Sequence, residues 1–197
     1  MVDAMSNVTV IIPHISTRQS GLMRALGSVV SQTLPARSIK VMTDVFRDGS
    51  AITRNRGLHG VETPWVAFLD DDDELLPHHL ETLVKAGLET GAQVVYPGCR
   101  VVDVNGAEIP RQEEWGRFGQ TFDAGLLRQK SYIPVTSLVR TAVAQRALFG
   151  APDGSVYDDW GFYLRALNNG AKFHHVPEVT WTWVHHGKNT SGRPDRW

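Results

Sequence analysis

Hydrophobic positions in the first half of the chain alternate between runs typical of strands and spacings typical of helices. Residues 8–12 form a β-branched run closed by Pro13, which predicts a buried strand that ends in a loop. Two more strands are predicted over residues 38–43 and 65–69, and helices over residues 20–34, 51–59 and 77–91. This alternation predicts a Rossmann-like α/β fold with a mostly parallel central sheet flanked by helices.

The second half of the chain predicts shorter elements. Further strands are expected over residues 94–97, 101–104, 133–139, 173–176 and 179–184, and helices over residues 141–148 and 158–167. Asn105-Gly106 is a hairpin-turn signal, and residues 111–125 predict a loop. We expect a single domain over residues 1–197, with a small antiparallel part in its C-terminal region.

Composition and charge exclude several classes of protein. The chain has 197 residues with a net charge of −1, so it has no basic footprint for nucleic acid. Cys99 is the only cysteine, which excludes an internal disulfide and favours a reducing compartment. No apolar run approaches the roughly 20 residues of a transmembrane segment, and Asp3 stands where a signal peptide carries positive charge. We therefore expect a cytoplasmic protein.

Four consecutive aspartates, residues 70–73, directly follow the predicted strand over 65–69. Adjacent carboxylates repel one another unless solvent or a cation compensates them, and hard oxygen ligands suit Mg²⁺, Mn²⁺ or Ca²⁺. The alternative is a solvated loop whose acids favour the start of the next helix. In open α/β sheets, however, ligands bind outside the carboxyl ends of strands, where Pro13, Asp44 and Asp70 all stand. We therefore expect a cation site within one pocket.

Three further groups could carry chemistry, and each has a plainer explanation. Asp158-Asp159 opens a helix and is either a cap or a source of a general base. The pair His185-His186 is either a surface turn or part of a metal site. Arg54 and Arg56 either pair with a diphosphate or lie on a solvated helix face.

Taken in order, these segments resemble the glycosyltransferase family 2 pattern of nucleotide-sugar transferases with the A-type (GT-A) fold. The similar segments are residues 8–13 (the first strand), 26–35 ("SVLxQTxP"), 49–58 ("ARNxG"), 68–77 ("FLDxDDxxxP"), 158–170 ("EDWxxxLRLxxxG") and 186–191 ("HxxxxS"). The chain departs from the family where residues 44–50 replace "DDGS" and residues 14–18 replace "TYNR". It also has Asp158-Asp159 in place of Glu-Asp.

The resemblance implies transfer of one sugar, with inversion, from a nucleotide diphosphate sugar to an acceptor hydroxyl. The nucleotide that it implies is uridine diphosphate (UDP), and the cofactor is Mn²⁺ or Mg²⁺ held by Asp72 with help from His186. Asp159 would be the general base that deprotonates the acceptor. Residues of about 1–98 would bind the donor and metal, and residues of about 99–197 would form the acceptor side.

The resemblance also implies a set of donor-binding residues. These are Pro13, His14, Ile15, Asp44, Arg54, Asp70 and Asp71. Asp44 would accept a hydrogen bond from the base, Arg54 would contact base or phosphate, and Asp70 would orient the ribose or the waters of the metal. The sequence names neither the sugar nor the acceptor. Trp115, Phe118 and Phe122 would form a platform for an acceptor sugar or pack on the core.

Two other functions compete with this interpretation. A nucleotidyltransferase would carry a glycine-rich, basic loop after the first strand, whereas residues 14–21 contain one Gly and one Arg. A non-catalytic module that binds sugar or a divalent cation would explain the aspartates and the six Trp. Such a module would have no use for Asp159.

Overall fold

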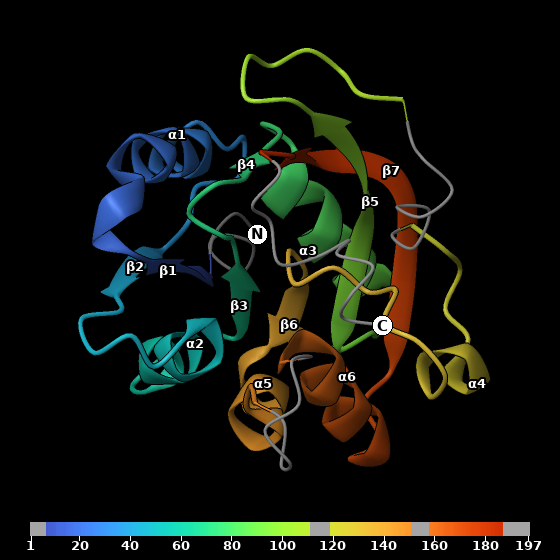
Figure 1. Cartoon of the computed structure of the whole chain (residues 1–197). Helices are drawn as coiled ribbons and strands as arrows, with labels where there is room; N and C mark the ends of the chain where they lie inside the picture. The colour runs from blue at the N-terminus through green and yellow to red at the C-terminus, as the bar shows by residue number, and fades with distance from the viewer. Residues whose placement is uncertain (1–6, 111–118, 151–157, 187–197) are drawn as a thin grey trace.

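In the computed structural model, the strands of the described residues form one mixed sheet (Figure 1). The structure describes residues 7–110, 119–150 and 158–186. The strands in these ranges are β1 (Val8–His14), β2 (Ser38–Thr43), β3 (Trp65–Phe68), β4 (Glu74–Leu75), β5 (Val94–Val102), β6 (Leu138–Arg140) and β7 (Phe173–Val184). The helices are η2 (Ser16–Arg18), α1 (Gln19–Val30), α2 (Ser50–Leu58), α3 (His79–Thr90), α4 (Ala124–Leu127), α5 (Thr141–Ala147) and α6 (Asp158–Asn168).

The strand order is β2-β1-β3-β6-β5-β7-β4. β1 pairs in parallel with β2 and β3, and β5 pairs in parallel with β7, so most of the paired residues lie in parallel ladders. The short strand β6 runs antiparallel to β3 and β5, and β4 runs antiparallel to β7. The predicted α/β fold with a mostly parallel sheet and a small antiparallel part is confirmed.

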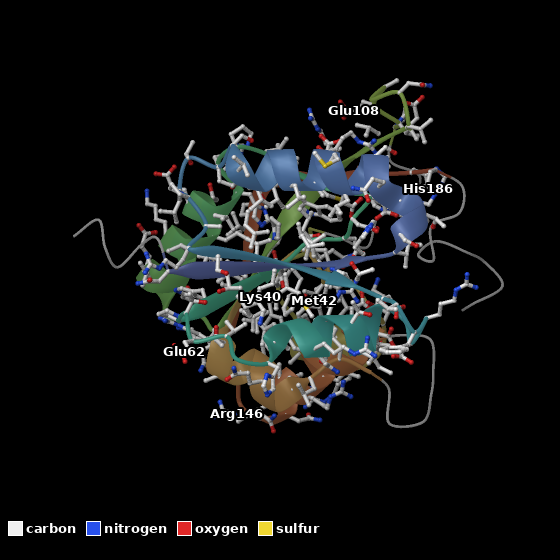
Figure 2. All side chains as sticks on the ribbon, turned by 90° about the vertical axis from the view of Figure 1, so that its left-hand side faces the viewer. Lys40, Met42, Glu62, Glu108, Arg146 and His186 are labelled. Carbon is white, nitrogen blue, oxygen red and sulfur yellow. The ribbon has the colours of Figure 1, made fainter. Side chains whose placement is uncertain are left out.

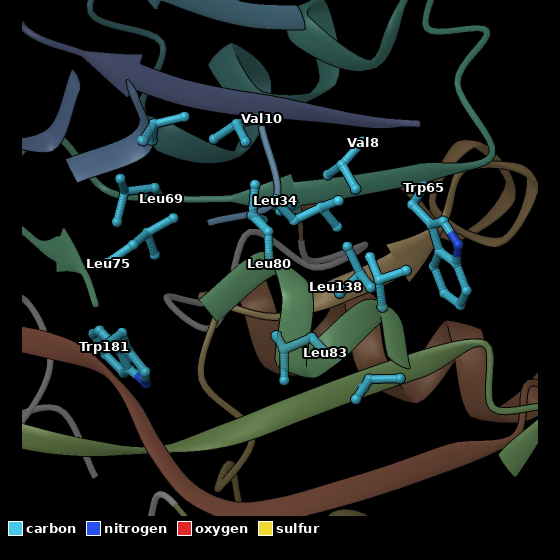
Figure 3. Close-up of a cluster of buried hydrophobic side chains, with 14 of the residues drawn as sticks. Val8, Val10, Leu34, Trp65, Leu69, Leu75, Leu80, Leu83, Leu138 and Trp181 are labelled. Atoms are coloured by element: carbon cyan, nitrogen blue, oxygen red, sulfur yellow. The ribbon is translucent and has the colours of Figure 1, made fainter. Parts of the chain in front are cut away.

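Helices cover both faces of the sheet. Figure 1 shows α1 and α3 on one side and α2, α5 and α6 on the other. On the first side, Leu80 of α3 packs with Val8 and Val10 of β1 (Figure 3), and Leu22 of α1 belongs to the same buried cluster. Because β1 is buried on both faces, its sequence is mostly apolar rather than alternating. In the described ranges, no helix is both long enough and apolar enough to cross a lipid bilayer.

The structure differs from the predicted elements mainly in the second half. β5 and β7 are each continuous, whereas the sequence predicted two strands for each. Their register shifts next to Pro97, where Pro177 and Glu178 of β7 are skipped, and a bulge of this kind lets proline remain inside a strand. In place of the strand predicted over 133–139, the structure has only the short strand β6 (Leu138–Arg140). The sequence predicted neither β4 nor α4.

Candidate functional site

The four aspartates follow β3 as a tight turn. The amide of Asp73 donates to the carbonyl of Asp70 at 3.1 Å, and β4 begins directly after the turn. α1 approaches so closely that a Cβ on Gly21 would lie 2.5 Å from the backbone oxygen of Asp71. Only glycine at this position allows α1 to pack against the aspartates.

Asp71 and Asp72 hold the segment that follows β1. Asp71 Oδ2 lies 2.9 Å from His14 Nδ1 and accepts from the amide of Ile15 at 3.1 Å. Arg18 donates from one guanidinium nitrogen to Asp71 Oδ1 at 3.1 Å and to Asp72 Oδ2 at 2.7 Å. Asp71 is only 3% exposed. Its carboxylate therefore anchors this segment, and donor binding by Asp71 stays a prediction.

The end of β7 meets the same turn. His186 Nε2 lies 2.9 Å from Asp72 Oδ2, and the amide of Val184 donates to Asp73 Oδ1 at 3.0 Å. Figure 2 shows His186 beside the start of α1. The structure therefore brings together the two residues predicted to bind the metal, Asp72 and His186, although they stand 114 positions apart.

The aspartate turn could hold a divalent cation. One oxygen from each of Asp70, Asp72 and Asp73 lies within 4.8 Å of the others. Burial and the neighbouring carboxylates raise the pKa of Asp72 and raise the pKa of Asp73 well above its ordinary value. A bound cation would relieve this crowding of negative charge, and carboxylate oxygens are the ligands that Mg²⁺ and Mn²⁺ prefer. The donor atoms therefore fit the predicted cofactor, with Asp70 and Asp73 joining the cluster.

The segment after β1 lies beside the loop after β2. Pro13 and His14 are buried in β1, whereas Ile15 is 39% exposed at its end. The amide of Asp44 donates to the carbonyl of His14 at 2.7 Å. Four of the predicted donor-binding residues thus lie together at the carboxyl edge of the sheet.

Asp44 also closes its own loop. Its two carboxylate oxygens accept from the amides of Asp48 and Gly49, both at 2.9 Å. Gly49 has a φ of 92°, which glycine adopts without strain. Asp44 therefore holds together the loop that stands where the family has "DDGS". Its contact with the base stays a prediction.

Arg54 is a buried cation at the centre of the site. It lies on α2, is 5% exposed, and donates to Asp70 Oδ1 at 2.5 Å. Its guanidinium lies 5.3 Å from the centre of the Phe149 ring. Burial alone would lower the pKa of Arg54, but the charges of Asp70, Asp159 and Asp158 outweigh burial and raise it. The structure thus joins the predicted residues Arg54, Asp70 and Asp159 in one electrostatic cluster.

Asp159 occupies the first turn of α6. Its Oδ1 accepts from the amide of Trp160 at 2.8 Å. Burial raises the pKa of Asp159, and the positive charge of Arg54 opposes that shift. Burial raises the pKa of Asp158 as well, again opposed by Arg54. Both acids therefore suit proton transfer electrostatically, and the family motif is what favours Asp159.

A backbone clamp joins α2 to the chain that precedes α6. Asn55 Nδ2 donates to the carbonyl of Phe149 at 2.9 Å, and the amide of Phe149 donates to Asn55 Oδ1 at 2.8 Å. The Phe149 ring stacks on Phe162 of α6 with 4.2 Å between ring centres. Arg165 of α6 donates to two carbonyls at the end of α5, at 2.6 and 2.7 Å. These contacts hold α6, and with it Asp159, against α2.

We expect Asn55→Ala to lower the free energy of unfolding by about 1–3 kcal/mol, because the backbone amide and carbonyl of Phe149 both lose their partner. Urea denaturation measures this change. Asn105→Ala, in an exposed turn, is the matched control and should change stability by less than about 0.5 kcal/mol. Equal effects of the two substitutions would contradict a clamping role for Asn55.

Sequence reasoning gave Arg18 and Asn55 no part in this site, and it included Asp73 in the aspartate run without a role of its own. Asn55 and Asp73 lie inside the motifs quoted above, so the motifs themselves contained the signal. The contact of Arg18 with Asp72 crosses 54 positions and could not be read from local pattern.

Only one of the three aromatic residues considered as an acceptor platform is described. Phe122 stacks on Phe173 with 4.6 Å between ring centres and 7° between ring planes, so it packs on the core. Trp115 and Phe118 lie outside the described residues.

Fold and site together define an α/β domain of the GT-A class. Its fold is similar to crystal structures of residues 1–349 of TarS from S. aureus, with a TM-score of 0.70 and 18% identity over 90% of this chain and 60% of that one. The TarS structure in complex with UDP-GlcNAc gives a TM-score of 0.71 and 17% identity over 93% of this chain and 60% of that one. At this identity the likeness shows the fold alone.

Residues 30–147 match the family model of glycosyl transferase family 2, and the chain belongs to this family. It is also 29% identical over 144 residues to a Bacillus subtilis (strain 168) protein described as uncharacterized glycosyltransferase YwdF. That match covers 71% of this chain and 52% of the relative. The chain thus spans about half the length of this curated relative.

Proposed function

We propose that this chain is a metal-dependent, inverting glycosyltransferase that moves one sugar from a UDP-sugar to an acceptor hydroxyl. The observation that carries the proposal is the buried cation Arg54, which links Asp70 of the aspartate turn to Asp159 at the start of α6. Family membership supports the reaction class. TarS structures in complex with UDP and UDP-GlcNAc support the choice of nucleotide.

In this proposal residues of about 1–98 bind the donor and residues of about 99–197 form the acceptor side. Asp72 and His186, with Asp70 and Asp73, would hold Mn²⁺ or Mg²⁺, whose charge would stabilise the departing diphosphate. Asp159 takes the proton of the acceptor hydroxyl. The hydroxyl oxygen then attacks the anomeric carbon from the side opposite the diphosphate, so the configuration at that carbon inverts.

The experiment that tests the proposal incubates the protein with a panel of UDP-sugars and Mn²⁺ and measures the release of UDP. NMR then gives the configuration at the anomeric carbon of the released sugar. UDP release from at least one donor is expected. A nucleotidyltransferase would instead release pyrophosphate from a nucleoside triphosphate, and a binding module would bind UDP-sugars without breaking them. Either of these two results would overturn the proposal.

We expect Asp44→Ala to weaken UDP binding by about 1–3 kcal/mol, because a charge-assisted hydrogen bond to the base is lost. Isothermal titration calorimetry with UDP and Mn²⁺ measures the change.

A matched control tests whether the loss of any aspartate that closes a surface turn weakens UDP binding. Asp103 Oδ1 likewise accepts from two backbone amides of its own turn, those of Asn105 and Ala107, at 2.8 and 2.9 Å. Asp103→Ala should leave UDP affinity unchanged. If Asp44→Ala also leaves it unchanged, Asp44 does not bind the base.

A further inference from the structure

Arg18 places a permanent positive charge on the aspartate turn. It ends η2, directly after β1, and its side chain is 37% exposed. One of its guanidinium nitrogens contacts Asp72 Oδ2 at 2.7 Å and Asp71 Oδ1 at 3.1 Å. Asp71, one of the two carboxylates that Arg18 contacts, is itself fixed, because it also contacts the His14 ring and accepts from the amide of Ile15.

The carboxylate of Asp72 that Arg18 contacts also belongs to the cluster that could bind a metal ion. Asp72 Oδ2 already lies within hydrogen-bond distance of both Arg18 and His186. An imidazole can give up its proton and turn to a metal, but a guanidinium stays charged at any pH that proteins tolerate. Arg18 and a divalent cation on the same carboxylate would repel each other, so the binding of one weakens the binding of the other.

The Arg18 side chain is 37% exposed, so a ligand that binds beside the aspartate turn can reach its guanidinium. A guanidinium pairs with phosphate oxygens through two parallel hydrogen bonds, and this is among the strongest pairings open to it. A diphosphate that binds together with a cation would therefore give Arg18 a new partner close to the carboxylate of Asp72, which Arg18 would leave.

We propose that Arg18 competes with the divalent cation for Asp72 and, when displaced, binds the diphosphate of the donor. Cation and nucleotide then bind cooperatively, since each makes the exchange of Arg18 more favourable for the other. This inference rests on the proposed function and adds to it a residue that couples the metal to the nucleotide.

The test measures Mn²⁺ and UDP affinities by calorimetry for the unaltered chain, Arg18→Gln and Arg24→Gln. Without nucleotide, Arg18→Gln should bind Mn²⁺ about tenfold more tightly, because a like charge has been removed from the site. With saturating Mn²⁺, the same variant should bind UDP about tenfold more weakly, because a phosphate partner is lost. Arg24 forms an ion pair with exposed Glu74, at 3.1 Å, so Arg24→Gln is the matched control and should change neither affinity.

If Arg18 exchanges partners, the two affinities should move in opposite directions. Unchanged or weaker Mn²⁺ binding by Arg18→Gln, with UDP binding retained in the unaltered chain, would overturn the role of Arg18 and leave the proposed function standing. If neither the unaltered chain nor Arg18→Gln binds Mn²⁺ or UDP, the proposed function itself is overturned. Arg18→Lys keeps the charge, so its Mn²⁺ affinity should stay at the unaltered value. If Arg18→Gln does not fold, a tenfold rise in the Mn²⁺ affinity of Arg18→Lys contradicts the competition.

Discussion

Asp159→Asn should lower kcat for sugar transfer by about 10²–10⁴-fold while UDP and Mn²⁺ affinities barely change. The amide is nearly isosteric with the carboxylate, and its oxygen can still accept from the amide of Trp160. It cannot take a proton from the acceptor hydroxyl, however. Steady-state kinetics give kcat, and calorimetry gives the two affinities.

The pH profile provides a second readout for Asp159. A general base works only when ionised, so activity should fall as pH drops through its pKa. Burial raises the pKa of Asp159 while Arg54 opposes that shift, and the acid limb should therefore lie above the ordinary carboxyl range near 4. The residual activity of Asp159→Asn should lack this limb.

Asp158→Asn is the matched control, because this acid stands next to Asp159 and its pKa is also raised by burial. We expect it to lower kcat less than Asp159→Asn does, since Asp158 would cap α6 or orient its neighbour. Near-full activity of Asp159→Asn, or a larger loss in Asp158→Asn, would exclude Asp159 as the base. Melting curves of both variants must match that of the unaltered chain for the comparison to hold.

Removal of the divalent cation should weaken UDP binding by about 100-fold or more, because the diphosphate would then lose the charge of the cation beside the carboxylates of the turn. Calorimetry of UDP binding with Mn²⁺ and with EDTA measures this loss. In Asp72→Asn, most of the effect of Mn²⁺ on UDP affinity should be lost, since Asp72 belongs to the carboxylate cluster and contacts His186.

Glu74→Gln is the control for the loss of one negative charge near this turn. Its carboxylate pairs with Arg24 and lies outside the cluster of Asp70, Asp72 and Asp73. The effect of Mn²⁺ on UDP affinity should survive this substitution. Equal UDP affinity in Mn²⁺ and in EDTA for the unaltered chain would remove the metal from donor binding.

Most of the donor side could be predicted from the sequence because it depends on local pattern. β2 has the predicted bounds, and β1 and β3 differ from their predicted ranges by one or two residues at the carboxyl end. His14, Asp44 and Asp70 stand at the ends of β1, β2 and β3 or within two residues of them, and parallel strands present these ends at one edge. The neighbourhood of His14, Asp44 and Asp70 follows from this rule.

The second half was harder to predict because its strands depend on distant partners. Pro97 reads locally as the end of a strand, yet β5 continues past it because β7 bulges at the same point. The antiparallel direction of β6 has no local signal either, since the long connection from β5 allows either direction. The partners of Asp71 and Asp73 were equally inaccessible, because Arg18 and Val184 reach the turn from remote segments, whereas the family resemblance had already placed His186 with Asp72.

The strand order has a consequence for how the chain folds during its synthesis. β6 lies between β3 and β5, so these two strands are never neighbours. A nascent chain that has reached residue 98 can pair β1 with β2 and β3, but β5 must wait for β6 to leave the ribosome. Meanwhile β3 has an open edge that can pair with other chains. Expression of residues 1–98 alone would keep that edge open and lead to aggregation rather than to an isolated nucleotide-binding domain.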